Sequence, residues 1–254
     1  MANIASIWRY PVKGLTPEPL AMADLVAGAY FPNDRKYAVE VGPSGFDPAS
    51  PAHVPKMRFT VLARFPELAR LRTRLDDASG VFHIGDAHGF GVEVRLDTED
   101  GRAALARFLQ AYLGEEAMPP LKVLPAPDGH RFMDHPQGHV SFLNLATVRA
   151  VERAIGRTVD PLRFRANLHV EGLAAWDEDA LEFGAPVLVG AARLTAFKPI
   201  ERCVATHVDL ETGTRDIDML GELREHFGRV TLGTYLAIER GGAIREGDTV
   251  RLTP

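Results

Sequence analysis

Four segments in the first half of the chain alternate apolar and polar residues, as half-buried strands do. In 57–63, for example, every second residue is apolar, and Arg58 and Thr60 fall between them. A period of two places the apolar side chains on one face of an extended segment. The pattern therefore predicts strands at Ile4–Tyr10, Lys36–Val41, Met57–Ala63 and Val92–Leu96.

Other segments repeat apolar residues at the spacing of a helix. After Pro66, which suits a first helical turn, leucines follow at 68, 71 and 75. An acidic stretch at Asp97–Asp100 opens a second such segment, and Gly114 can end it. Asn144 and Gly156 are typical caps for a third. The sequence predicts helices over 66–75, 97–114, 145–156 and 217–227.

The second half contains mostly short strand patterns between turn residues. They lie at Leu168–Val170, Val187–Val189, Arg193–Phe197, Thr231–Glu239 and Thr249–Leu252, with tight turns at Gly241-Gly242 and Gly247-Asp248. Strands and helices do not alternate regularly enough for a doubly wound sheet. We expect a β-rich α+β fold, with an N-terminal mixed β/α domain over 1–117 and a β-barrel-like domain over 118–254.

Composition and charge exclude several classes of protein. The chain has 254 residues, a net charge of −5 and a single cysteine. One cysteine cannot form an internal disulfide or hold an iron–sulfur cluster, and the acidic balance disfavours a general nucleic-acid binder. No apolar run is long enough to span a membrane, and the first residues read as a strand, not a signal peptide. We expect a cytoplasmic protein without membrane or nucleic-acid partners.

The usual phosphate-loop, dinucleotide-binding, zinc-protease and hydrolase motifs are absent from the sequence. Three histidines, His130, His135 and His139, share a Pro/Gly-rich loop with Asp128 and Asp134. Their spacing matches no standard zinc pattern, so solvated loop histidines are the favoured interpretation over a metal site.

The only cysteine, Cys203, directly follows Arg202 after a predicted strand, with Thr206 and Asp209 close behind. A neighbouring guanidinium favours the thiolate, which is both a metal ligand and a nucleophile. The alternative is a small buried hydrophobic residue, the commonest role of a lone intracellular cysteine.

A second candidate cluster lies at Arg163–Asn167, where two arginines flank a phenylalanine and an asparagine follows. Arginine binds phosphate through paired hydrogen bonds, and asparagine can satisfy the amides of a heterocycle. An ordinary solvated strand edge remains the alternative. Lys13 and Arg35 are two further cations that could contribute to an anion-binding pocket, or simply lie on the surface.

Taken in order, five segments resemble the MOSC family (molybdenum cofactor sulfurase C-terminal domain) with its N-terminal β-barrel domain. They are YPVKGL at 10–15, DRKY at 34–37, RFRAN at 163–167 with Gly172 and Trp176–Asp179, RCVATHVD at 202–209 with Thr212-Gly213, and LGTY at 232–235 with the two later glycine turns. Each segment is weak alone, but together they keep the family's order over almost the whole chain.

The resemblance implies that the chain binds molybdenum cofactor, a pterin dithiolene with a phosphate, possibly in a nucleotide form. Cys203 would be the thiolate ligand of molybdenum, which suits a soft metal site. Lys13, Gly14, Arg35 and Arg165 would surround the phosphate and pterin edge. Asn167 and Arg202 would hold the ring, with Ser141 and Thr206 as further contacts. Gly14 replaces a frequent serine of the family, and Ala166 replaces a usual proline.

The resemblance also implies a reaction, because characterised members resemble the mitochondrial amidoxime-reducing component and reduce N-hydroxylated compounds. Asp209 is the candidate catalytic acid, with water as an equal alternative. Electrons would come from a separate ferredoxin-, flavodoxin- or cytochrome-type protein, since no redox motif of that kind is visible in the sequence. Two other hypotheses remain: a sulfur carrier with a persulfide on Cys203, and a non-catalytic module that binds or stores the cofactor.

Overall fold

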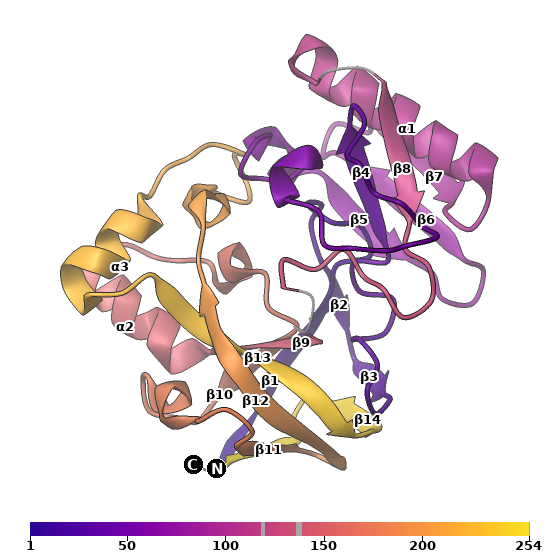
Figure 1. Cartoon of the computed structure of the whole chain (residues 1–254). Helices are drawn as coiled ribbons and strands as arrows, with labels where there is room; N and C mark the ends of the chain where they lie inside the picture. The colour runs from indigo at the N-terminus through magenta and orange to yellow at the C-terminus, as the bar shows by residue number, and fades with distance from the viewer. Residues whose placement is uncertain (118–119, 136–138, 254) are drawn as a thin grey trace.

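The computed structural model describes residues 1–117, 120–135 and 139–253 and contains a closed seven-stranded β-barrel. Its strands, in spatial order, are β10 (Leu168–Glu171), β9 (Val140–Asn144), β13 (Thr231–Arg240), β12 (Ala192–Glu201), β11 (Pro186–Val189), β15 (Thr249–Leu252) and β1 (Ala2–Arg9). Pairing of β1 with both β15 and β10 closes the ring, and β2 (Glu18–Leu20) adds to β1. The first strand of the chain therefore belongs to a barrel that is otherwise built from the second half (Figure 1).

The first half also builds three small sheets beside the barrel. Strand β4 (Tyr37–Val41) pairs with β8 (Leu121–Pro125), and β5 (Arg72–Leu75), β6 (Val81–Gly85) and β7 (Gly91–Arg95) form an antiparallel meander. Strand β3 (Met22–Leu25) pairs with β14 (Gly242–Arg245) of the second half. This second pairing between the halves adds to the contacts that hold them together.

Within the described residues there are three α-helices, and local sequence signals explain their ends. They are α1 (Glu99–Leu113), α2 (Leu145–Ile155) and α3 (Met219–Phe227). The Asn144 side chain accepts a hydrogen bond from the Ala146 amide, and Gly156 ends α2 in the left-handed conformation. Short 3₁₀ turns complete the set: η1 (Lys56–Arg58), η2 (Pro66–Arg70), η3 (Gly114–Glu116), η4 (Pro161–Phe164), η5 (Asp177–Ala180) and η6 (Val204–His207).

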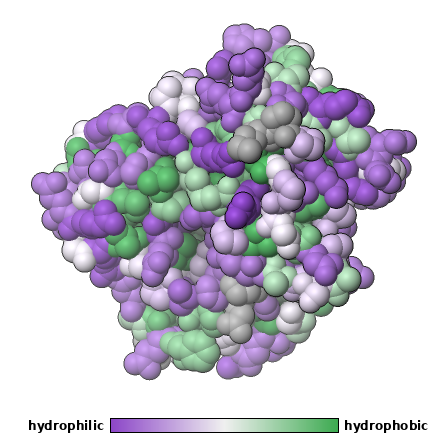
Figure 2. Space-filling view, turned by 45° about the horizontal axis from the view of Figure 1, so that its top comes forward, coloured by the Kyte–Doolittle hydropathy of each residue, from purple (hydrophilic) through white to green (hydrophobic). Residues whose placement is uncertain are grey.

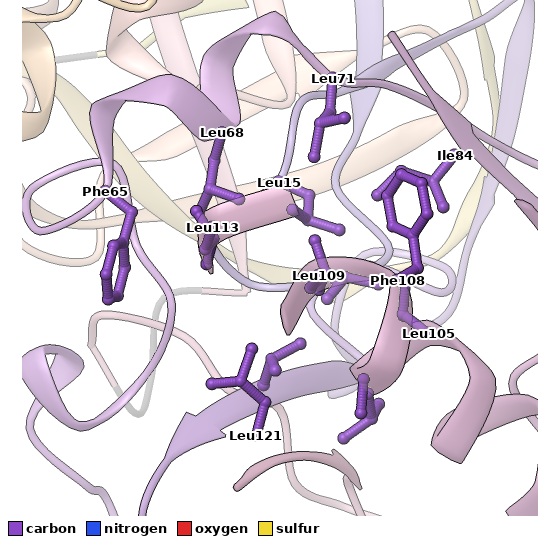
Figure 3. Packing of buried hydrophobic residues seen from close by; sticks show 14 of the residues in the cluster. Leu15, Phe65, Leu68, Leu71, Ile84, Leu105, Phe108, Leu109, Leu113 and Leu121 are labelled. Carbon is purple, nitrogen blue, oxygen red and sulfur yellow. The ribbon is translucent and has the colours of Figure 1, made fainter. Parts of the chain in front are cut away.

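Separate hydrophobic clusters support the two halves. The barrel interior is filled by aliphatic residues of its strands, such as Ile4, Val187 and Leu236. In the first half, α1 packs its apolar face against β7 and β8, and its Leu105 and Leu109 share one buried cluster with Leu15 and Leu68 (Figure 3). On the face that Figure 2 shows, hydrophilic residues form most of the surface and hydrophobic ones appear as separate patches. Both halves therefore have enough buried apolar surface to hold their elements rigidly.

The β-rich α+β class and the barrel are confirmed, but two local predictions are wrong. Residues 57–63 form η1 and a turn, because Phe59 makes only an isolated bridge to Glu40 and the Phe65 amide bonds back to Val61. The predicted helix over 66–75 is instead η2 followed by β5. Pairing with β6 stabilises the extended form of Arg72–Leu75, which the leucine spacing did not reveal.

Six strands have no predicted counterpart, β2, β3, β6, β8, β9 and β14, and β5 was predicted as part of a helix. Strand β9 is buried on both faces and so shows no alternation, and β14 begins at Gly242, the second residue of the turn predicted at Gly241-Gly242. The predicted domain boundary after Ala117 falls at residues 118–119, which lie outside the described residues. The division into 1–117 and 118–254 stays a prediction.

Candidate functional site

A hollow lies where the ends of barrel strands meet loops of the first half. Its volume is about 800 Å³, counting the part open to solvent. Eight of the residues predicted for the site lie in its wall: Lys13, Gly14, Arg35, Ser141, Arg165, Arg202, Cys203 and Thr206. These residues come from both halves of the chain, so the site depends on how the two halves pack together.

Cys203 lies at the end of the loop after β12 and directly precedes η6. It is partly exposed, and its carbonyl accepts hydrogen bonds from the Thr206 amide and hydroxyl, both at 2.9 Å. The Lys56 ammonium lies near Cys203 and is influenced by its sulfur. Partial burial lowers the pKa of Lys56, but Asp134 and Cys203 raise it more, so the net pKa lies above the ordinary value. The thiol therefore faces a permanently charged cation at the wall of the hollow.

Arg165 and Arg202 are held by backbone carbonyls and not by carboxylates. Arg202 Nε donates to the Leu232 carbonyl and its Nη1 to the Phe164 carbonyl, both at 2.7 Å, and Arg165 Nη2 donates to the Leu15 carbonyl at 2.8 Å. Burial lowers the pKa of Arg165, and it lowers the pKa of Arg202 to about 10. Carbonyl oxygens satisfy the donors without neutralising the charge, so both side chains stay cationic at neutral pH.

The buried Tyr10 ring supports two of the arginines at this site. The guanidinium carbons of Arg35 and Arg165 lie 4.2 and 4.5 Å from the ring centroid. Arg35 also forms an ion pair with Asp34 and donates to the Arg165 carbonyl at 2.9 Å. Burial raises the pKa of Tyr10 to about 12, so the ring is neutral and stacks as a π-face between the cations.

The backbone at the site adopts conformations that are uncommon for side-chain-bearing residues. Arg35 and Arg165 have φ values of 44° and 53°, in the left-handed region. Gly14 has φ +86°, and a Cβ there would lie 1.9 Å from the Thr60 carbonyl oxygen. Only glycine fits this position, so the serine that is frequent in the family would not be tolerated by this backbone. Such local strain often accompanies functional sites.

Lys13 is almost fully buried and pairs with Asp134, a residue that sequence reasoning mentioned only as a neighbour of the histidines. Its Nζ donates to the Phe132 carbonyl at 3.0 Å and forms an ion pair with Asp134. Burial lowers the pKa of Lys13. Desolvation raises the pKa of Asp134, but Lys13 and the neighbouring Lys56 and Arg35 lower it well below its usual range. Asp134 is therefore a charged carboxylate inside a mostly cationic wall.

Two predicted residues do not line the hollow. Asn167 is fully buried, accepts hydrogen bonds from the Ser141 amide (3.1 Å) and hydroxyl (2.7 Å), and donates to the Trp8 carbonyl (3.1 Å). Asp209 is bound by Arg163 at 3.0 Å and by the Thr212 amide at 2.7 Å. Hydrogen bonds from Thr212 lower the pKa of Asp209 despite partial burial, so this carboxyl carries no proton to give at neutral pH.

Sequence reasoning missed Lys56, Arg163 and Tyr235 as wall residues. Arg163 is the first arginine of the predicted anion-binding cluster, so a signal for it was present. Tyr235 lies on β13, and burial raises its pKa to about 12. Lys56 follows an irregular Pro/Gly-rich segment in which nothing marks it as special. In total the wall has six lysines and arginines against the carboxylates of Asp134 and Glu201.

The histidines of the Pro/Gly-rich loop pack against aromatic rings. His130 packs against Phe46 and Phe132, and His139 against Tyr30. Among the described residues, no group of three or more His, Cys, Asp or Glu side chains is suitably placed for a metal ion. Nor does any helix of the described ranges combine the length and apolar character needed to cross a bilayer.

The sequence of the chain matches the models of a known family over almost its whole length. Residues 129–251 match the model of the MOSC domain, and residues 1–116 match that of the MOSC N-terminal beta barrel domain. The chain belongs to the family of MOSC-domain proteins that carry this N-terminal domain. Membership of the family associates the chain with molybdenum cofactor.

Individual relatives are more distant. Mitochondrial amidoxime-reducing component 1 of Mus musculus is 30% identical over 122 residues, which cover 43% of this chain and 35% of that protein. The match thus spans about a third of the relative's length. YUAD protein from Bacillus subtilis has a TM-score of 0.47 and 13% identity, covering 98% of this chain and 93% of its own. YiiM from Escherichia coli has a TM-score of 0.37 and 18% identity, covering 50% and 60%.

Proposed function

We propose that the hollow binds molybdenum cofactor and that the protein reduces N-hydroxylated compounds with electrons from a separate donor protein of the ferredoxin, flavodoxin or cytochrome type. The observation that carries the proposal is the position of Cys203, a partly exposed thiol in a wall with six cationic side chains. A thiolate suits a soft metal, and the cations suit a phosphate-bearing ligand. Similarity of part of the chain to an amidoxime-reducing component supports this choice of reaction.

The residues of the wall fit such a ligand in charge and in hydrogen-bonding capacity. Arg165 and Arg202 enter no ion pair within the described residues, so their charges are available to an anion. Buried Arg163 Nε also has no hydrogen-bond partner in that part of the chain. In this proposal Lys13, Arg35 and Arg165 bind the phosphate and pterin edge, and Arg202 lies beside the metal ligand Cys203.

In this proposal the cofactor and the protein have different roles in the reduction. When bound, molybdenum cofactor would supply the two-electron exchange that removes oxygen from an N–O bond. The protein would hold it through Cys203, balance its negative charge and orient the substrate at the open side of the hollow. We assign proton delivery to water from the open mouth and not to Asp209, because both oxygens of that carboxylate accept hydrogen bonds and its pKa is lowered.

The proposal is tested by metal and pterin analysis of protein expressed in a host that makes the cofactor. Wild-type protein should carry molybdenum and pterin and reduce benzamidoxime with a chemical reductant. Cys203→Ser should fold, lose molybdenum during purification and lose the activity. Val204→Ala, which alters an exposed neighbour on the same turn, should behave like wild type.

Other outcomes would support the alternatives. A persulfide on Cys203 without molybdenum would favour sulfur transfer, and bound cofactor without turnover of any N-hydroxylated compound would favour a storage module. Full activity of Cys203→Ser would remove the thiol from the mechanism.

A further inference from the structure

Arg163 is a buried arginine that binds the segment following Cys203. Its side chain is 3% exposed and lies on η4. Nη1 donates to the His207 carbonyl at 3.2 Å and to Asp216 Oδ1 at 2.7 Å, and Nη2 donates to Asp209 Oδ2 and Asp216 Oδ2, both at 3.0 Å. One side chain therefore fixes three points of the segment 207–216.

The same short turn η4 also holds the residue before the cysteine. The Phe164 carbonyl accepts a hydrogen bond from Arg202 Nη1 at 2.7 Å. On the other side of Cys203, η6 is a single turn, with the Cys203 carbonyl bonded to Thr206 at its start and the His207 carbonyl bonded to Arg163 at its end. Contacts to η4 therefore hold the chain on both sides of Cys203, and the orientation of the Cys203 side chain depends on both contacts.

We propose that Arg163 is a positioning residue that fixes the Cys203 thiol relative to the cations of the hollow. The inference rests on the proposed function, because it assumes that Cys203 serves as the ligand of the cofactor. A guanidinium is required since a lysine ammonium cannot reach four acceptors at fixed angles, although it carries the same charge. Arg163 also lines the hollow, and its buried Nε has no hydrogen-bond partner among the residues that the structure describes.

The carboxylates of Asp209 and Asp216 balance the charge of the buried Arg163 guanidinium. Both carboxylates bind Arg163, and Asp216 also accepts from Arg157 Nη2 at 3.1 Å. Arg157 is half exposed and binds the same carboxylate from the solvent side. Substitution of Arg157 therefore disturbs Asp216 without removing any contact of Arg163, which makes it a matched control.

The test measures the surroundings of the thiol directly, because the chain has one cysteine and the carboxymethylated or carbamidomethylated thiol, followed by peptide mass spectrometry, reports on Cys203 alone. Protein purified without cofactor is alkylated at one pH with neutral iodoacetamide and with anionic iodoacetate, and the ratio of the two rates is compared between variants. Nearby cations favour the anionic reagent. Arg163→Lys should lower the iodoacetate preference by a factor of about two or more, because the thiol moves relative to Lys56 and Arg202 while the total charge is unchanged.

The same variants, expressed in a cofactor-competent host, should differ in molybdenum content, with a loss in Arg163→Lys and none in Arg157→Ala. An unchanged alkylation ratio in a folded Arg163→Lys protein would overturn the proposal, even if its unfolding midpoint fell. If Arg163→Lys does not fold, Asp216→Asn decides: a lowered ratio supports positioning and a wild-type ratio refutes it. If wild-type protein holds no molybdenum, the proposed function fails, yet the alkylation ratio still decides the role of Arg163.

Discussion

Replacement of Asn167 by alanine removes a buried amide that joins three strands of the barrel. Its side chain contacts Ser141 at the start of β9 and Trp8 in β1, and its own backbone directly precedes β10. Asn167 is fully buried and Ser141 almost so. Alanine leaves the Ser141 amide and the Trp8 carbonyl without these partners.

Three hydrogen bonds are lost, each worth about 1 kcal/mol, and buried groups left unpaired can cost more. We therefore expect the free energy of unfolding to fall by about 3 kcal/mol. For a chain of this size that corresponds to a decrease of about 6–12 °C in Tm. Because Ser141 lines the hollow and loses two of its contacts, cofactor retention should also fall.

Urea denaturation followed by far-UV circular dichroism measures the change, with Asn3→Ala as the control. Asn3 lies in β1, is only half buried and donates from Nδ2 to the Glu171 carboxylate at 3.2 Å. That variant should lose no more than about 0.5 kcal/mol. A loss below about 1 kcal/mol in Asn167→Ala would refute the reasoning, because it would mean that these buried contacts are readily replaced.

Three further substitutions test other parts of the structure. Arg165→Ala removes one charge-assisted contact, so cofactor should be retained about 10- to 150-fold more weakly in equilibrium dialysis. Arg193→Ala, which breaks an exposed ion pair, should retain cofactor like wild type. Equal retention by the two variants would count against the site. Gly14→Ala places a Cβ against the Thr60 carbonyl and should lower the unfolding free energy by about 3 kcal/mol or more, and a wild-type urea midpoint would contradict this. Burial lowers the pKa of His169 to about 4. As the pH falls below about 6.5, the unfolded chain therefore binds a proton that the folded chain does not, and the free energy of unfolding of wild type falls by up to about 3 kcal/mol by pH 4. His169→Leu should lack that part of the loss, and parallel stability curves would disprove the assignment.

The parts of the fold that could be predicted are those with strong local signals. Helix α2 has both an asparagine cap and a left-handed glycine, and α1 has an amphipathic face that packs on a sheet. Strand β9 has the burial pattern of a segment covered on both faces, where no periodicity remains to be detected. In the turn at 57–65, Met57 is exposed and residues 59–63 are buried without alternation, including Thr60. The apolar–polar alternation of the sequence alone therefore gave the wrong element.

The residues themselves marked Cys203, Arg163–Asn167, Lys13 and Arg35 as candidates, but only the ordered resemblance of five segments predicted that they belong to one site. Nothing in the local sequence says that Lys13 and Asp134 meet across 121 residues of chain. The role of Asp209, by contrast, had a local signal: an aspartate three residues before a threonine and four before a glycine is typical of a side-chain-capped turn. Its Oδ1 accepts from the Thr212 amide, as such a turn requires.

The electrostatics of the hollow explain how an acidic chain can bind an anion. The chain has a net charge of −5, so it has more carboxylates than cations. If each cation of the hollow were paired with a carboxylate, little positive charge would remain there for an anion. Of the wall cations, Lys13, Arg35 and Arg163 form ion pairs with carboxylates, while Arg165 and Arg202 are held by carbonyl oxygens. The lowered pKa of both shows that holding these charges in a partly desolvated place costs free energy. An anion bound to them would offset that cost in the folded state alone, so occupation of the hollow and stability of the barrel are coupled through the same guanidinium groups.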